Sequence, residues 1–139
     1  MHLNLEDQHI FVTGGSRGIG LAIVKDLLNS GSRVSTVSTK LSDELEKLKN
    51  NYPTALNYIK INLLNPEEIK LAWNKANDIK PVTGLVNNAG VAFSSDLKSE
   101  EHNQWLSDWD KTFAINTRAT AYLCKLAIET FSNSSGEES

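Results

Sequence analysis

Short apolar runs alternate with amphipathic segments along this chain. The apolar runs are bounded by polar or glycine-containing turns, as is typical of buried strands in a parallel sheet; they are His9–Thr13, Arg33–Ser38, Ala55–Ile61 and Val82–Asn87. The segments after them carry apolar residues at helical spacing. These predicted helices are Ile19–Leu28, Ser42–Asn50, Asn65 to about Asn77, and Ser107 to about Phe131.

Several helix ends carry recognisable capping residues. Gly31 stands where a C-terminal cap glycine is expected. Asn65 and Pro66 suit the N-cap and first helical position, and two acids follow them, which complements the helix dipole. Asp43 with Glu46, and Ser107 with Asp110, resemble capping boxes at the start of the second and fourth helices.

Four strands alternating with four helices predict an α/β fold built from right-handed parallel βαβ units. We expect a Rossmann-like sheet with strand order 3-2-1-4, truncated to four strands. Helices 1 and 2 should cover one face of the sheet, and helices 3 and 4 the other. The crevice between strands 1 and 4 is then a topological switch point, where such folds bind ligands. Residues 1–131 form the expected domain, and residues 132–139 form a polar tail.

Composition narrows the class of protein only modestly. The 139 residues are 40% hydrophobic and 22% charged, with a net charge of −3, so nothing favours nucleic acid or an anionic membrane as a partner. A single cysteine, Cys124, excludes an intrachain disulfide, and the scattered histidines give no metal-ligand spacing. Glu6 and Asp7 stand where a signal peptide would be apolar, and no apolar stretch approaches the ~20 residues of a membrane span, so a cytoplasmic protein is the expectation.

The turn after the first strand carries the clearest chemical signal. Residues 13–20 read T-G-G-S-R-G-I-G, between a predicted strand and a predicted helix. Gly14 permits a tight turn, Gly18 allows a pyrophosphate to approach the backbone, and Gly20 allows close helix packing. The free N–H groups at the helix start then favour phosphate. A glycine-rich turn by itself can be purely structural, but this context favours a dinucleotide site.

Three motifs in order resemble the short-chain dehydrogenase/reductase family. They are the T-G-x-x-x-G-I-G turn, the N-N-A-G of Asn87–Gly90, and the stretch from Trp109-Asp110 to Phe113-Ala-Ile-Asn116. The resemblance covers nearly the whole chain. It implies an oxidoreductase that binds a nicotinamide dinucleotide and acts on a small carbonyl or alcohol substrate.

The resemblance also implies roles for individual residues. Asn116 resembles the family's active-site asparagine, which holds a water in a proton relay; without the resemblance, a buried polar residue that bends a helix would be the simpler interpretation. Asn62 stands where the family usually has an aspartate at the adenine. The expected cofactor-binding residues are Gly14, Ser16, Arg17, Gly18, Ile19, Gly20, Ser38, Thr39, Lys40, Asn62, Leu63, Asn88, Ala89 and Gly90.

The end of the second strand favours NADP over NAD. An NAD site uses an acidic residue about 20 positions after the glycine turn to bind the ribose 2′-hydroxyl. The corresponding residues here are Ser38, Thr39 and Lys40, with no acid among them. Hydroxyls and cations, including Arg17 in the turn, would attract a 2′-phosphate that a carboxylate would repel. Lys40 could also be an ordinary surface lysine.

The family's reactive serine and Tyr-x-x-x-Lys motif are absent. Tyr122 and Lys125 are three residues apart, not four, and are expected to be ordinary helix residues. We therefore expect the N-terminal part of an NADP-dependent oxidoreductase, inactive as this chain; the alternative is a non-catalytic nucleotide-binding module with a sensor or regulatory role. The region holding Phe93, Asp96, His102 and Trp105 would border the substrate, or form a surface loop.

Self-association is also expected. The run Gly84–Asn88 has no expected neighbour on its outer edge. The last helix carries more apolar side chains than one sheet face was expected to hide: Phe113, Ala121, Leu123, Leu126, Ala127 and Phe131.

Overall fold

A four-stranded parallel sheet forms the centre of the molecule. The computed structural model describes residues 4–93, 98 and 101–135, and no side chain beyond Asn133. Strands β1 (His9–Thr13), β2 (Arg33–Ser38), β3 (Leu56–Lys60) and β4 (Gly84–Val86) lie in the order β3-β2-β1-β4, all parallel. The Rossmann-like order 3-2-1-4 is confirmed.

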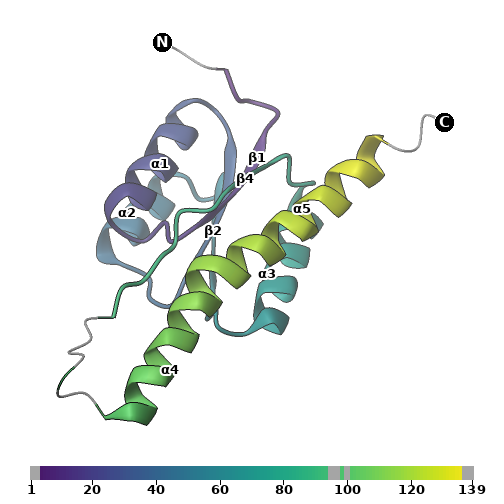
Figure 1. The fold of residues 1–139 in the computed structure, drawn as a ribbon. Helices are drawn as coiled ribbons and strands as arrows, with labels where there is room; N and C mark the ends of the chain where they lie inside the picture. Colours follow the sequence, from purple (N-terminus) through teal and green to yellow (C-terminus); the bar gives the residue numbers. More distant parts are fainter. Residues whose placement is uncertain (1–3, 94–97, 99–100, 136–139) are drawn as a thin grey trace.

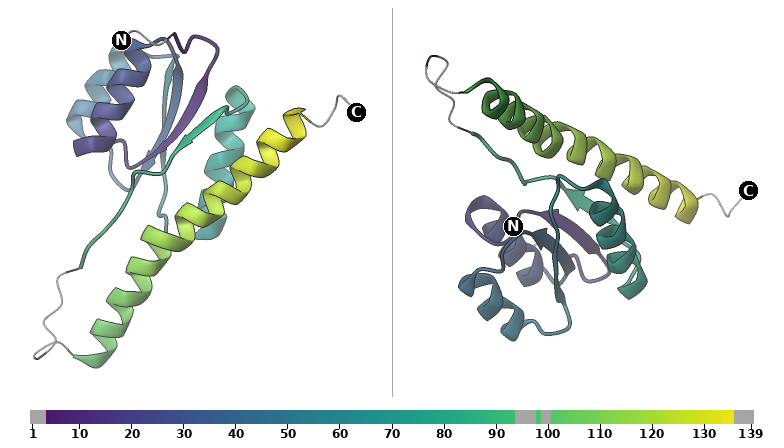
Figure 2. Two further views of the ribbon diagram at one scale, coloured as in Figure 1. Left: turned by 45° about the horizontal axis from the view of Figure 1, so that its top comes forward. Right: turned by 90° about the horizontal axis from the view of Figure 1, so that it is seen from below.

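Two helical layers cover the two faces of the sheet. Helices α1 (Gly18–Asn29) and α2 (Asp43–Asn51) lie on one face, and α3 (Pro66–Ile79) and α5 (Ala119–Ser135) on the other (Figures 1 and 2). Adjacent β1 residues supply both cores, since side chains alternate along a strand. Phe11 packs with α3 and α5, where its ring lies 5.1 Å from that of Trp73, and Val12 packs with α1 and α2.

The last helical segment is one long rod with an irregular turn in it. Helix α4 (His102–Phe113) passes through a π-helical turn, η1 (Ala114–Arg118), directly into α5. α5 packs along the sheet, whereas α4 projects beyond the carboxyl ends of the strands (Figures 1 and 2). α5 continues to Ser135, beyond Phe131, where the last helix was expected to end.

One predicted helix cap and one predicted helix start are wrong. Ser42, not Asp43, caps α2, because its Oγ accepts from the Leu45 N–H at 3.1 Å. The rod begins at His102 and not at Ser107, because the Glu101 carboxylate accepts from the N–H groups of Asn103 and Gln104 at 3.0 and 3.1 Å. A carboxylate that satisfies two free N–H groups and complements the helix dipole makes a sufficient start. Gly31, with φ +92°, follows the C-cap of α1 as expected.

A neutral histidine is built into the first strand. His9 is fully buried; its Nδ1 donates to the carbonyl of Lys80 at 2.7 Å, so its Nε2 accepts from the Ser35 hydroxyl at 2.8 Å. Desolvation lowers the pKa of His9, and the nearby charges of Arg33 and Lys80 lower it further, against the opposing effect of the Lys80 carbonyl.

Stability should therefore decrease in mild acid. Because the folded-state pKa lies below the unfolded value of 6.5, the unfolded chain binds more protons, and the free energy of unfolding falls as pH drops below about 6.5. We expect urea denaturation midpoints to fall between pH 7 and pH 5.5, with a smaller fall in a His9→Gln variant. An identical fall in both proteins would contradict a contribution from His9.

Candidate functional site

A cleft of about 950 Å³ opens at the carboxyl ends of the strands. It is lined by the loops that follow β1, β2, β3 and β4, together with Ile115 of η1. Of the predicted cofactor-binding residues, all line this cleft except Gly20. The topology therefore brings together residues from four loops that lie far apart in the sequence, at the predicted switch point.

Two glycines of the turn after β1 adopt conformations that other residues disfavour. Gly14 and Gly18 have φ values of +71° and +57°, in the left-handed region. Gly20 is needed for a different reason: a Cβ there would overlap the carbonyl oxygen of Gly14 and approach Asn88 Nδ2 to 2.5 Å. Gly20 is buried and does not line the cleft; its lack of a side chain lets the start of α1 pack against Gly14 and Asn88.

The N-N-A-G segment is held against the end of β1. The buried Thr13 Oγ1 accepts from the backbone N–H groups of both Asn88 and Ala89, each at 3.0 Å. Asn88 Nδ2 donates back to the carbonyls of Thr13 and Gly14, each at 3.2 Å. These four hydrogen bonds lock the loop after β4 to the glycine turn, so that two walls of the cleft form one unit.

A hydroxyl network joins the glycine turn to the loop after β2. The hydroxyls of Ser16 and Ser38 both donate to the carbonyl of Lys40, at 2.5 and 2.8 Å. Ser42 donates to the carbonyl of Ser16, and Tyr58 donates to that of Ser38 at 3.1 Å. The start of α2 is thereby fixed beside the turn.

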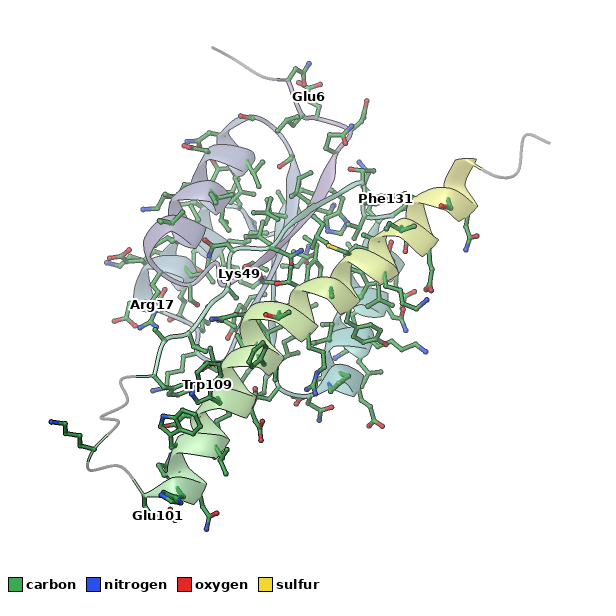
Figure 3. The ribbon with its side chains drawn as sticks, viewed as in Figure 1. Glu6, Arg17, Lys49, Glu101, Trp109 and Phe131 are labelled. Atoms are coloured by element: carbon green, nitrogen blue, oxygen red, sulfur yellow. The ribbon has the colours of Figure 1, made fainter. Side chains whose placement is uncertain are left out.

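The cleft carries charges of both signs. Arg17, Lys40 and Asp43 are exposed and line it; Figure 3 shows Arg17 at the turn before α1. No ion pair joins these three residues; among the residues that the structure describes, the ion pair present is Lys125–Glu129 in α5. Asp43 was not among the predicted site residues, because the acid of an NAD site is expected at the end of β2 and not in the first turn of α2.

Asn116 lies in the π-helical turn and binds the backbone of Val91, in the segment that follows β4. Its Oδ1 accepts from the Val91 N–H at 2.8 Å, and its Nδ2 donates to the Val91 carbonyl at 2.7 Å. The amide retains one lone pair and one N–H for other partners. π turns occur frequently at functional sites. The helix is irregular at Asn116, but this residue is exposed and not the buried polar residue of the simpler interpretation.

The loop after β3 is supported by two hydrogen bonds. Asn62 Oδ1 accepts from the Leu64 N–H at 2.9 Å, and Arg118 of η1 donates to the Leu64 carbonyl at 3.0 Å. Asn62 lines the cleft, with its second lone pair available for a ligand. Arg118 thus ties η1 to the loop after β3.

The region expected to border the substrate is partly helical. His102 and Trp105 lie in α4 and not in a loop, and Asp96 lies outside the described residues. Trp105, Trp109 and Phe113 follow each other along one side of α4, with ring centroids 5.5 and 5.7 Å apart. Figure 3 labels Trp109 on this projecting helix.

Sequence reasoning missed several cleft residues. They are Val37, Leu41, Ser42, Asp43, Ile61, Val91 and Ile115. Most of them end a strand or follow one directly, beside a predicted residue, so their position at the strand ends was the signal in the sequence that could have identified them.

In the described part of the chain, no three His, Cys, Asp or Glu residues are grouped to hold a metal ion, and no helix is long and apolar enough to cross a membrane.

These features define a Rossmann-like α/β domain with its glycine turn at the switch point of a parallel sheet. Residues 8–137 match the family model described as short chain dehydrogenase. The chain belongs to the short-chain dehydrogenase/reductase family.

Individual relatives agree with this assignment. An acetoacetyl-CoA reductase from Synechocystis is 34% identical over 130 residues, which are 93% of this chain and 49% of that protein. A short-chain dehydrogenase from Burkholderia cenocepacia, solved in complex with NADP, is 27% identical with a TM-score of 0.80, covering 91% of this chain and 51% of that one. A blue fluorescent protein from a metagenomic library, solved with NADPH, is 30% identical with a TM-score of 0.73, covering the same 91% and 51%.

The chain spans about half the length of the curated relatives it matches. The match lies in the half that carries the glycine turn and the N-N-A-G segment.

Proposed function

We propose that this chain is the NADP-binding part of an oxidoreductase that acts on a carbonyl or hydroxyl group. The observation that carries the proposal is that Arg17 and Lys40 line the same cleft as the hydroxyl-bearing end of β2, where an NAD site would place an acid. The NADP and NADPH complexes of the two structural relatives support the same choice of cofactor.

Each wall of the cleft would hold one part of the dinucleotide. The turn at Gly14 and Gly18 and the N-terminus of α1 would bind the pyrophosphate. Arg17, Ser38, Thr39 and Lys40 would bind the 2′-phosphate, and Asn62 and Leu63 the adenine. Gly90 would border the nicotinamide side, where the bound cofactor supplies hydride transfer. Asn116 does not itself line the cleft but holds the backbone of Val91, which does.

Binding without turnover is the expected behaviour of the 139-residue chain. The residues that would exchange a proton with the substrate, a serine and a Tyr-x-x-x-Lys pair in this family, have no counterpart in this sequence. Asn116 alone cannot supply a general acid, because its amide does not ionise.

The cofactor choice is tested by calorimetry with NADP and NAD. NADP should bind more tightly, and Arg17→Ala should reduce that preference by about 1–3 kcal/mol, the range for a charge-assisted hydrogen bond. Lys25→Ala is the matched control, because Lys25 is an exposed cation of α1 that does not line the cleft. Equal affinity of the unmodified chain for NADP and NAD would refute the proposal.

We also propose that the chain self-associates or binds another chain through α4, α5 and the outer edge of β4. The Thr83 N–H donates to the His9 carbonyl of β1. Because the backbone N–H and C=O groups of successive residues in a strand point to opposite sides, those of Gly84 and Val86 point to the outer edge of β4. Leu123, Leu126 and Ala127 are buried on the sheet, contrary to the expectation that they add to the exposed surface. Other large apolar side chains of the rod are 36–64% exposed: Leu106, Trp109, Phe113, Ile128 and Phe131.

Sedimentation at micromolar concentration tests this proposal. Exposed apolar side chains along one helix, beside an open strand edge, favour association. We expect a species heavier than the 15.4 kDa monomer. A monomer whose β4 amides exchange freely with solvent would count against the proposal.

A further inference from the structure

The first turn of α2 places a negative charge in the proposed 2′-phosphate site. Three acids lie in that turn, Asp43, Glu44 and Glu46, but only Asp43 lines the cleft. It shares the cleft wall with Arg17 and Lys40. First-turn acids also stabilise a helix through its dipole, which would account for all three without explaining why one faces the cleft.

The position of Asp43 is fixed by bonds from its neighbour. Ser42 Oγ donates to the carbonyl of Ser16 in the glycine turn and accepts from the Leu45 N–H of α2. This one hydroxyl joins the start of α2 to the turn that carries Arg17. Asp43 follows directly and is the first residue of the helix, so its backbone is held beside the turn by the bonds of Ser42.

We propose that Asp43 is a specificity-determining residue that weakens binding of the 2′-phosphate. This inference rests on the proposed function, because it assumes that nucleotides bind in this cleft. Two cations and one carboxylate line the same cleft, without an ion pair between Asp43 and either cation among the described residues. A 2′-phosphate therefore meets attraction from Arg17 and Lys40 and repulsion from Asp43. The cleft discriminates between NADP and NAD less strongly than its cations alone would dictate.

The consequence is measurable with small probes. Adenosine 2′,5′-bisphosphate and adenosine 5′-monophosphate differ only in the 2′-phosphate, and calorimetry on the 139-residue chain gives both affinities. Asp43→Asn should tighten the bisphosphate by about 3- to 10-fold, the size expected for one charge near a partly solvated site, and leave the monophosphate unchanged. The gain should shrink toward zero at 1 M salt, where the Debye length is about 3 Å.

Glu44→Gln is the matched control. Glu44 is exposed, lies in the same first turn and does not line the cleft, so it reports any general effect of removing an acid from α2. Its bisphosphate affinity should stay unchanged. An equal gain in both variants, or a gain in Asp43→Asn that persists at 1 M salt, would overturn the proposal.

Failure of the inference and failure of the proposed function give different results. If the unmodified chain binds the bisphosphate and Asp43→Asn binds it equally well, Asp43 has no such role and the cofactor assignment stands. If neither protein binds either probe, or both bind the two probes equally, the 2′-phosphate site itself is refuted and the inference falls with it.

Discussion

A Gly20→Ala variant should fail to form a stable domain. The added Cβ would overlap the carbonyl oxygen of Gly14 and press on Asn88 Nδ2. Neither can yield easily: the first is backbone in a turn with positive φ, and the second is held by carbonyls of Thr13 and Gly14. Overpacking typically costs about 1–3 kcal/mol and occasionally more, and two rigid neighbours place this site at the upper end of that range. This is a large part of the ~5–15 kcal/mol that stabilises a typical domain.

Gly18→Ala separates this effect from the general cost of losing a glycine. A Cβ on Gly18 meets nothing within 4 Å, so only its φ of +57° opposes the substitution, at about 1–2 kcal/mol. Urea denaturation followed by circular dichroism should therefore rank Gly20→Ala well below Gly18→Ala. The reverse order would mean that the turn packs differently from the structure described.

Thr13→Val should cost about 2–4 kcal/mol, because two N–H groups lose their acceptor at about 1–2 kcal/mol each. Valine has nearly the shape of threonine, so the core packing of this buried residue is kept. What disappears is the oxygen that accepts from Asn88 and Ala89. The free energy of unfolding from urea titration measures the loss directly.

Thr13→Ser provides the comparison, since it keeps the hydroxyl and removes only a methyl group. We expect serine to retain most of the stability lost in the valine variant. Nucleotide affinity should follow the same order, because the two bonds hold the N-N-A-G wall against the glycine turn. If serine proves as damaging as valine, the methyl group and not the hydroxyl supports this part of the fold.

The sheet could be predicted because its signals are local. Three of the four predicted strands are apolar runs that stop at a glycine or an asparagine, namely Gly14, Asn62 and Asn87. Right-handed crossovers then leave little freedom in strand order. Thirteen of the fourteen predicted cofactor residues line the cleft for the same reason: they follow strand ends, and the carboxyl ends of parallel strands share one edge. The exception, Gly20, has a role in packing that spacing alone does not distinguish from contact.

The predictions that fail concern short sequence patterns that are compatible with more than one structure. Ser107 and Asp110 resemble a capping box, but Glu101 satisfies the free N–H groups earlier, and nothing then ends the helix before Ser107. Asp43 was overlooked as a cleft residue because a first-turn acid usually serves its own helix. Only the bond from Ser42 to Ser16, which joins segments distant in sequence, reveals where the start of α2 lies.

The π-helical turn also sets the rotational phase between the two halves of the long helix. Ala114 and Ala119, the buried residues at its two ends, are five positions apart, one more than an α-helical face would repeat. Each residue of an α-helix advances the face by about 100°. Deleting one residue between 114 and 118 would restore a regular helix. Because Leu123 is held in the core against the sheet, the deletion would rotate Trp109 and its aromatic neighbours by about that angle relative to α5. An insertion or deletion in this segment therefore leaves α5 packed on the sheet and rotates α4 about its axis, so that the side chains of α4 point in new directions.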